Sequence, residues 1–285
     1  MFGVLLLGGL GTRLAPSTLY VNKHFLLVND KPMFYYPLST LMLMGIRDIV
    51  FVSNKSTLTQ LKNVMKTGSD FGCNFFYRIQ DEPGGIPHAI QSASDLLHGN
   101  SYTVILGDNF FYGVGLGQSL AKQSLNLGAK IFCYKVKNPS DYGVVTISDG
   151  KISSIEEKPK FPKTNLAITG LYMFEGNSLE LIKQLKKSKT RNEFEVTDLL
   201  NLYNANNLLE MEILPRGTSW LDMGSNKTIN ETAAYLHVIQ ERQGSQIASL
   251  EEIALNQGWI TAKILSKYLE SKPHSSYYEY LHSLI

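Results

Sequence analysis

The sequence predicts an α/β fold: a mixed, mainly parallel sheet flanked by helices, with a small β-rich part and a helical C-terminal tail. Three observations support this prediction. Short apolar runs alternate with segments of helical spacing up to residue 106, as in parallel strands joined by crossover helices. The middle of the chain carries consecutive strand-like runs with little helix between them. Residues 244–285 again show helical spacing.

The composition is that of an ordinary globular protein. The 285 residues suffice for one large domain or two small ones, and a net charge of +2 gives no support to nucleic-acid binding. No apolar run approaches the roughly 18 residues of a membrane helix, so we expect no membrane partner. Cys73 and Cys133 lie far apart and outside any C-x-x-C motif, which predicts free thiols in a cytoplasmic protein.

The first part of the chain alternates strands with helices. We predict strands at 4–7, 49–52, 75–79 and 104–106, and helices at 31–44, 57–66 and 86–97. Gly45 and Gly99 follow two of these helices, at positions where glycine commonly ends a helix. Ligands of such sheets bind outside the carboxyl ends of the strands, so polar residues at those ends are site candidates.

The rest of the chain changes from strands to helices. We predict strands at 130–136, 143–147, 152–156, 168–174 and 208–214, and helices at 179–187, 196–203, 227–242, 250–256, 262–269 and 277–284. Asp149-Gly150, between two strands, is a strong hairpin signal. Four tyrosines of the tail look exposed: Tyr268, Tyr277, Tyr278 and Tyr280. Such a tail either caps the main domain or makes a subunit contact.

A glycine-rich turn follows the first predicted strand. Gly8, Gly9 and Gly11 leave backbone N–H groups unshielded by side chains, and Arg13 adds a cation with forked donors. These features suit a nucleotide phosphate, although many glycine turns are only tight turns. The turn matches neither the dinucleotide fingerprint, whose third glycine would stand at Leu14, nor the P-loop, because Gly-Thr-Arg replaces Gly-Lys-Ser/Thr.

Two aspartates are candidate metal ligands. Asp108 follows the strand at 104–106, and Asp222 lies in Trp-Leu-Asp-Met-Gly. Mg²⁺ prefers one or two carboxylates together with substrate phosphates. Each aspartate alone is as well explained as a helix cap or turn residue, and their pairing cannot be derived from spacing.

A second group of polar residues suits a sugar phosphate. Lys158, fixed by the following proline, could hold a phosphate while Glu157 accepts sugar hydroxyl groups, and Tyr142-Gly143 could offer a backbone N–H. Arg191 could add a cation, although exposed charge explains these residues equally well. The sequence contains no H-E-x-x-H, G-x-S-x-G or Ser/His/Asp arrangement, so zinc or nucleophilic catalysis has no support.

Taken together, the motifs closely resemble the sugar-1-phosphate nucleotidyltransferases, specifically the short-form glucose-1-phosphate thymidylyltransferases. The resemblance covers essentially the whole chain. The matching segments are Gly8-Gly-Leu-Gly-Thr-Arg-Leu14, Lys23, Lys31-Pro-Met-Phe-Tyr-Tyr-Pro-Leu-Ser-Thr40, Leu106-Gly-Asp-Asn109, Asp141-Tyr-Gly-Val-Val145, Ile155-Glu-Glu-Lys-Pro159, Thr169-Gly-Leu-Tyr172, Glu195-Val-Thr-Asp198, Trp220-Leu-Asp-Met-Gly224, Arg242-Gln-Gly and Ile247-Ala-Ser-Leu-Glu-Glu-Ile-Ala254.

The resemblance implies a Rossmann-like nucleotidyltransferase fold at 1–243, with a nucleotide-binding half at 1–128 and a sugar-binding half at 129–226, followed by a helical tail at 244–285. It implies Mg²⁺-dependent transfer of a nucleotidyl group from dTTP to glucose 1-phosphate. The products would be dTDP-glucose and pyrophosphate, as in the first step of deoxysugar pathways such as that to rhamnose. The sugar phosphate would attack the α-phosphorus in line, without a covalent enzyme intermediate. A cytoplasmic homotetramer is the implied assembly.

The resemblance also assigns residues to roles. It implies catalytic roles for Arg13, Lys23, Asp108 and Asp222, with both aspartates on the metal. The nucleotide would contact Leu6, Gly8, Gly9, Gly11, Thr12, Arg13, Gln80, Gly85 and Asp108, with Gln80 and Gly85 reading the pyrimidine edge. The sugar phosphate would contact Asn109, Tyr142, Gly143, Glu157, Lys158, Thr169, Arg191 and Trp220.

The chain departs from the family pattern at a few positions. His88 stands where the family has glutamine near the nucleotide pocket, and Asn192 replaces a glycine after the arginine. Gly113-Val-Gly115 replaces a Gly-His-Asp of the family's regulatory site. These changes concern base and sugar choice and regulation more than reaction type. The alternatives are therefore the same chemistry with UTP or another hexose 1-phosphate, or a non-catalytic regulator that binds nucleotide sugars.

Overall fold

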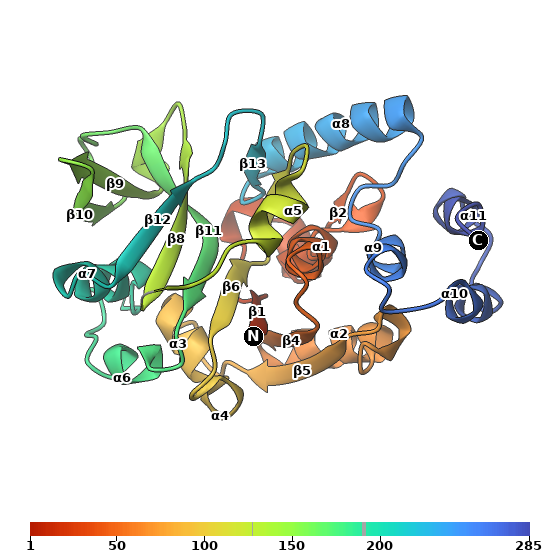
Figure 1. Cartoon of the computed structure of the whole chain (residues 1–285), viewed down its shortest axis with the longest axis horizontal. Helices are drawn as coiled ribbons and strands as arrows, with labels where there is room; N and C mark the ends of the chain where they lie inside the picture. Colours follow the sequence, from red (N-terminus) through yellow and green to blue (C-terminus); the bar gives the residue numbers. More distant parts are fainter. Residues whose placement is uncertain (127, 190–191) are drawn as a thin grey trace.

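The computed structural model describes residues 1–126, 128–189 and 192–285, and it has one large twisted sheet covered by helices (Figure 1). In this part of the chain the sheet has nine strands, seven of them in the order β10-β9-β11-β6-β1-β4-β5. β8 pairs with β11, and β12 pairs with β8. No helix of the described residues is long and apolar enough to cross a bilayer.

The parallel half contains β1 (Phe2–Leu6), β4 (Asp48–Ser53), β5 (Asn74–Ile79) and β6 (Tyr102–Leu106). Alternate side chains of β1 enter different cores. Leu5 packs in the core that includes α1 (Tyr35–Leu43) and α2 (Lys55–Met65), whereas Val4 packs in the core that includes α3 (Gly85–Gln91). Helices on both faces thus bury the apolar strands β1, β4 and β6, as the sequence predicted, whereas the edge strand β5 is partly exposed.

The other half is mainly antiparallel. It contains β8 (Ala129–Lys135), β9 (Gly143–Ser148), β10 (Lys151–Glu157), β11 (Leu166–Phe174) and β12 (Leu209–Ile213). Asp149 and Gly150 join β9 to β10 with φ values of 51° and 74°. Positive φ at both central residues is the conformation that a two-residue hairpin requires, so the hairpin prediction is confirmed. α6 (Ser178–Ile182) and α7 (Val196–Ala205) cover this half.

Several element predictions were wrong in detail. The helix expected at 31–44 begins only at Tyr35, because Lys31–Pro32 forms the short strand β3, paired with β2 (Leu27–Val28). The helix expected at 86–97 is split into α3 and α4 (Ser94–Leu97), and the helix expected at 179–187 ends at Ile182. Besides β2 and β3, the prediction missed the strands β7 (Asn109–Tyr112) and β13 (Ser219–Asp222) and the helix α5 (Leu116–Ala121).

The C-terminal region consists of α8 (Asn226–Gln243), α9 (Leu250–Asn256), α10 (Ala262–Leu269) and α11 (Ser276–His282). Figure 1 shows the last three helices at the end of the molecule opposite the antiparallel strands, and α9 contacts α1. The four tail tyrosines are half-buried and not exposed as expected. Tyr268 and Tyr277 donate hydrogen bonds to the buried carboxylate of Glu251, at 3.0 and 2.5 Å. The domain boundaries given above remain predictions.

Candidate active site

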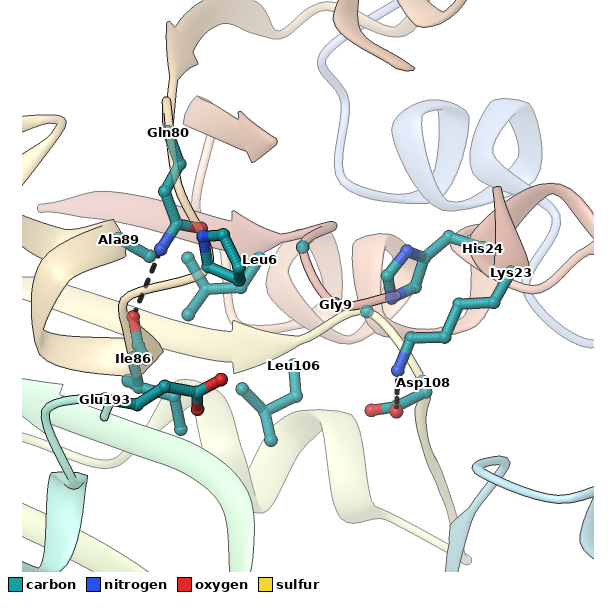
Figure 2. A pocket seen from close by; sticks show the side chains of 14 residues that line it. Leu6, Gly9, Lys23, His24, Gln80, Ile86, Ala89, Leu106, Asp108 and Glu193 are labelled. Carbon is teal, nitrogen blue, oxygen red and sulfur yellow. Dashed lines mark hydrogen bonds and ion pairs between the residues drawn. The ribbon is translucent and has the colours of Figure 1, made fainter. Parts of the chain in front are cut away.

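Two neighbouring cavities lie at the carboxyl ends of the central strands, each with a volume of about 210 Å³. Three residues line both of them, namely Ile86, Leu106 and Asp108. The other lining residues of the first cavity (Figure 2) are Leu6, Gly8, Gly9, Lys23, His24, Gln80, Pro83, Gly85, Ala89, Gly107 and Glu193. Those of the second are Arg13, Asn109, Asp141, Tyr142, Glu157, Lys158, Ile168, Thr169, Gly170, Tyr172, Val196, Trp220 and Asp222.

The glycine turn borders the first cavity. β1 ends at Leu6, and Gly9 and Gly11 then take φ values of 96° and 61°, which residues with a Cβ rarely adopt. A Cβ added to Gly9 would lie 3.8 Å from the Lys23 ammonium nitrogen, so the lysine passes close to the bare backbone of the turn. The arrangement brings a cation and a glycine backbone to one wall, which suits a phosphate chain.

Lys23 and Asp108 form an ion pair at this wall. The Lys23 Nζ lies 2.6 Å from Asp108 Oδ2, and both side chains are more than four-fifths buried. Burial alone would raise the pKa of Asp108, but the charges of Lys23 and His24 and the hydrogen bonds that it accepts lower this pKa to about 2. Asp108 is therefore a carboxylate at neutral pH. Figure 2 shows the pair between the glycine turn and the end of β6.

Asp222, at the end of β13, lies close to the Lys23–Asp108 ion pair. The β13–β7 register pairs Asp222 with Asn109, and the Met223 N–H donates to the Asp108 carbonyl at 2.8 Å. Burial, and then the negative charge of Asp108, raise the pKa of Asp222 to about 6, while Arg13 opposes this shift. Asp108 is buried and Asp222 is half-buried, and two carboxylates that repel one another in this way create a site for a cation.

Asn109 connects the aspartates to the second cavity. Its amide nitrogen donates to Asp108 Oδ1 at 3.0 Å, and its oxygen accepts from the Gly170 N–H at 3.1 Å and from the Trp220 indole at 2.6 Å. The Trp220 ring packs on Tyr142, with centroids 5.1 Å apart. Trp220 and Tyr142 thus form an aromatic wall, which is common where a sugar ring binds. The three hydrogen bonds of the Asn109 side chain fix the positions of Asp108, Gly170 and Trp220.

The structure brings most of the predicted site residues together. Gly11, Thr12 and Gly143 line neither cavity, although Gly11 lies next to Lys23 and Gly143 next to Glu157. Thr169 lines the second cavity, but its hydroxyl donates to the Phe132 carbonyl at 2.8 Å. Arg13 lies beside Asp222 and Gly224 at the second cavity, and Arg191 lies outside the described residues.

Sequence reasoning missed several lining residues, among them His24, Glu193, Asp141 and Tyr172. His24 is buried, its Nδ1 lies 2.8 Å from Asn22 Oδ1, and burial together with Lys23 lowers its pKa to about 3. The sequence could have indicated His24 as a site residue, because it directly follows the predicted Lys23. Asp141 likewise precedes the predicted Tyr142. Tyr172 ends the matched segment Thr169-Gly-Leu-Tyr172, and Glu193 lies two residues after Arg191, so their positions next to predicted site residues were also available signals.

Comparison with known proteins supports the interpretation that this geometry suggests. A family profile described as nucleotidyl transferase matches residues 2–238. Glucose-1-phosphate thymidylyltransferases of Neisseria meningitidis and Mycolicibacterium smegmatis are 40% and 41% identical to this chain over 287 and 286 residues. Each alignment covers 100% of this chain and 99% of the relative. The chain belongs to the glucose-1-phosphate thymidylyltransferase family of nucleotidyl transferases.

Solved structures agree with this assignment. A Bacillus anthracis chain assigned as a glucose-1-phosphate thymidylyltransferase, crystallised with sucrose, is 34% identical with a TM-score of 0.75. The match covers 82% of this chain and 95% of that chain. A UDP-glucose pyrophosphorylase complexed with UDP-glucose has a TM-score of 0.72 at 24% identity, covers 84% and 98% of the two chains, and shares the fold. The predicted family, fold and enzyme class are confirmed.

Proposed function

We propose that the protein transfers a thymidylyl group from dTTP to glucose 1-phosphate, which gives dTDP-glucose and pyrophosphate. The phosphate oxygen of the sugar attacks the α-phosphorus, and the bond between the α-phosphorus and the bridging oxygen of the leaving pyrophosphate breaks. One observation carries the proposal: two cavities share a buried carboxylate, Asp108, at the carboxyl ends of the strands. Two substrates in these cavities would meet beside that residue.

The first cavity would hold the nucleotide, because the glycine turn and Lys23 suit its phosphates, and Gln80 lies on the side of the cavity away from Lys23, where the base would bind. The second would hold the sugar phosphate, because it combines Trp220 and Tyr142 with Glu157 and Lys158. Such a reaction needs no nucleophile from the protein. The residues align the two substrates and neutralise the charge that develops on the phosphates.

Two cations of the chain border the place where the substrates would meet. Arg13 lies beside Asp222 on the second-cavity side, and Lys23 lies beside Asp108 on the first-cavity side. Arg13 can donate two hydrogen bonds to phosphate oxygens at once, whereas Lys23 acts as a point charge. We assign charge neutralisation to both, with Lys23 also holding Asp108 in its ionised state.

Nucleotidyl transferases of this family generally use a divalent metal ion. The chain's residues fit Mg²⁺ in this role, because Asp108 is buried, Asp222 is half-buried, and both are oxygen donors whose negative charges interact. Within the described residues, no cluster of three or more His, Cys, Asp and Glu forms a complete metal cage. Two carboxylates with substrate phosphates as further ligands are the arrangement that Mg²⁺ commonly takes, and the ion would offset phosphate charge there.

The proposal also includes an assembly and a setting. The family resemblance predicts a homotetramer in the cytoplasm that supplies dTDP-glucose to a deoxysugar pathway such as that to rhamnose. Light scattering after size-exclusion chromatography tests the tetramer, because a single-chain mass in dilute solution would contradict it.

The test of the reaction is pyrophosphate release from the purified protein. We would supply glucose 1-phosphate with dTTP, UTP or CTP, with and without Mg²⁺, and expect the fastest Mg²⁺-dependent release with dTTP. Asp108→Asn should reduce turnover by about 100-fold or more. Asp149→Asn removes the same charge in the β9–β10 turn and should retain turnover.

Other outcomes separate the alternatives. Faster release with UTP, or with another hexose 1-phosphate, would keep the chemistry and change the substrate. No release with any pair, together with tight binding of dTDP-glucose, would contradict the proposal in favour of a binding regulator.

A further inference from the structure

The orientation of the Gln80 side-chain amide decides whether the first cavity presents a hydrogen-bond donor or an acceptor to a base. Its nitrogen lies 3.3 Å from the Gly85 carbonyl oxygen and 3.3 Å from the His88 Nδ1 (Figure 2 draws the first contact). The Gln80 oxygen lies on the other side, 3.0 Å from where a Cβ of Gly8 would stand. Gly8 and Gln80 both line the cavity, so the oxygen faces the space where a nucleotide would bind.

The opposite orientation of this amide is unfavourable. Rotation by 180° would exchange the amide nitrogen and oxygen and place the oxygen about 3.3 Å from the Gly85 carbonyl oxygen. Two acceptors without a hydrogen between them repel one another. In the observed orientation, one N–H donates to Gly85 and the second can donate to His88 Nδ1. This second bond requires the ring proton of His88 to be on Nε2.

His88 is held in the position that accepts this bond. It lies on α3, eight residues after Gln80, and its ring rests against the backbone of Gly84. A Cβ on Gly84 would lie only 2.5 Å from His88 Nδ1 and 2.6 Å from its Cγ. The absence of a side chain at Gly84 thus permits this place for the ring. His88 itself does not line the cavity, so it acts through Gln80.

We propose that His88 is a positioning residue for base selection: by accepting the second amide proton of Gln80, it keeps the Gln80 oxygen directed at the base. This inference rests on the proposed function, in which the first cavity binds the nucleotide. An acceptor there pairs with the N3–H of thymine or uracil. Cytosine has an unprotonated N3 at the same position, so its lone pair would face the Gln80 oxygen.

UTP and CTP provide the sharpest comparison, because they share the ribose and the triphosphate and differ only along the base edge. Without the His88 acceptor, only the Gly85 carbonyl still favours the observed orientation of the Gln80 amide, so the turned orientation becomes less unfavourable. The turned amide pairs less well with uracil, and its N–H groups can reach the cytosine N3. We expect His88→Leu to reduce the ratio of kcat/KM for UTP to that for CTP by about threefold to tenfold, as for one neutral hydrogen bond. The change should appear in KM more than in kcat, because the base is not at the reacting phosphorus.

His88→Asn supplies the rescue. The Asn oxygen can occupy the place of Nδ1 and accept the same proton, so this variant should restore most of the UTP-to-CTP ratio. His98→Leu is the matched control, because it removes an exposed histidine that lines neither cavity. A general loss of packing in His88→Leu would lower kcat/KM for both nucleotides equally and would leave the ratio unchanged.

The outcomes separate this inference from the proposed function. If the wild-type protein is inactive with dTTP and UTP, the proposed function fails and the inference fails with it. If the wild-type protein is active but His88→Leu keeps the wild-type UTP-to-CTP ratio, or His88→Asn lowers it as much as leucine does, only the role of His88 is refuted.

Discussion

Replacement of Gly85 by alanine tests the packing that borders the first cavity. Gly85 begins α3 with a φ of 88°, and its carbonyl oxygen accepts the Gln80 amide proton. A Cβ here would lie 2.1 Å from the Phe194 carbonyl oxygen, closer than real contacts allow. The Gly84 carbonyl also accepts from the Phe194 N–H at 2.9 Å, so the two segments are already in close contact. They would have to separate by about 1 Å to admit the methyl group.

The expected loss of stability has two sources. A residue with a Cβ in the left-handed region costs about 1–2 kcal/mol, and forced separation of packed backbone costs about 1–3 kcal/mol more. Gly99 isolates the first source, because its φ is 74° and nothing lies within 4 Å of its added Cβ. We expect Gly99→Ala to lower the Tm by about 2–4 °C and Gly85→Ala to lower it about twice as far.

Scanning fluorimetry measures the Tm values, and pyrophosphate release at saturating glucose 1-phosphate measures the KM for dTTP. Gly85 and Glu193 both line the first cavity, so a shift of about 1 Å should raise this KM roughly tenfold. Gly99→Ala should leave it unchanged. Equal Tm losses in the two variants, or a wild-type KM in Gly85→Ala, would refute the reasoning.

Three further predictions concern polar side chains of the interior. The pKa of His24 is lowered to about 3, mainly by burial, so between pH 6.5 and 3 the unfolded chain binds a proton that the folded chain does not. The free energy of unfolding should therefore decrease as the pH is lowered, by up to about 1.4 kcal/mol per pH unit. The urea midpoint of His24→Asn should depend less steeply on pH than that of the wild type, and equal slopes would contradict this. Lys23→Met leaves the Asp108 carboxylate without its cation and should cost about 2–4 kcal/mol in urea unfolding with a chelator present. The double variant Lys23→Met/Asp108→Asn should be more stable than Lys23→Met alone, because it no longer carries an unpaired buried carboxylate. If the losses in the free energy of unfolding of the two single variants simply add in the double variant, the ion pair does not contribute to stability. Tyr277→Phe removes a donor to buried Glu251 and should cost about 1–2 kcal/mol, measured as a lower Tm and faster proteolysis of the tail; wild-type behaviour would show that this bond does not hold the tail.

Local patterns were enough to predict much of the fold. The central parallel strands β1, β4 and β6 are buried on both faces and therefore appear as apolar runs in the sequence. The hairpin at Asp149-Gly150 depends on two adjacent residues, and the tail helices at 250–256 and 262–269 have the predicted bounds. The glycine turn and Asp108 were predicted to follow strands, and they follow β1 and β6 at the edge of the first cavity.

The features that could not be predicted from the sequence depend on contacts between segments that are far apart in the chain. β7 has only four residues, and its partner β13 lies more than 100 positions later in the chain. The register of this pair brings Asp222 beside Asp108, which spacing could not predict. The tail tyrosines were misjudged for a similar reason. A tyrosine can bury its ring when its hydroxyl finds a partner, and for Tyr277 that partner is Glu251 on another helix.

The position of Asp108 follows from the topology of the sheet. It lies two residues after the end of β6, which pairs in parallel with β1 on one side and antiparallel with β11 on the other. β6 is thus the boundary between the half that carries the glycine turn and the half that carries the aromatic wall. A side chain at its end can face both cavities, whereas Gln80 after β5 faces only the first. We therefore expect changes at Asp108 to affect both substrates, and changes at Gln80 or its partner His88 to affect the choice of nucleotide alone.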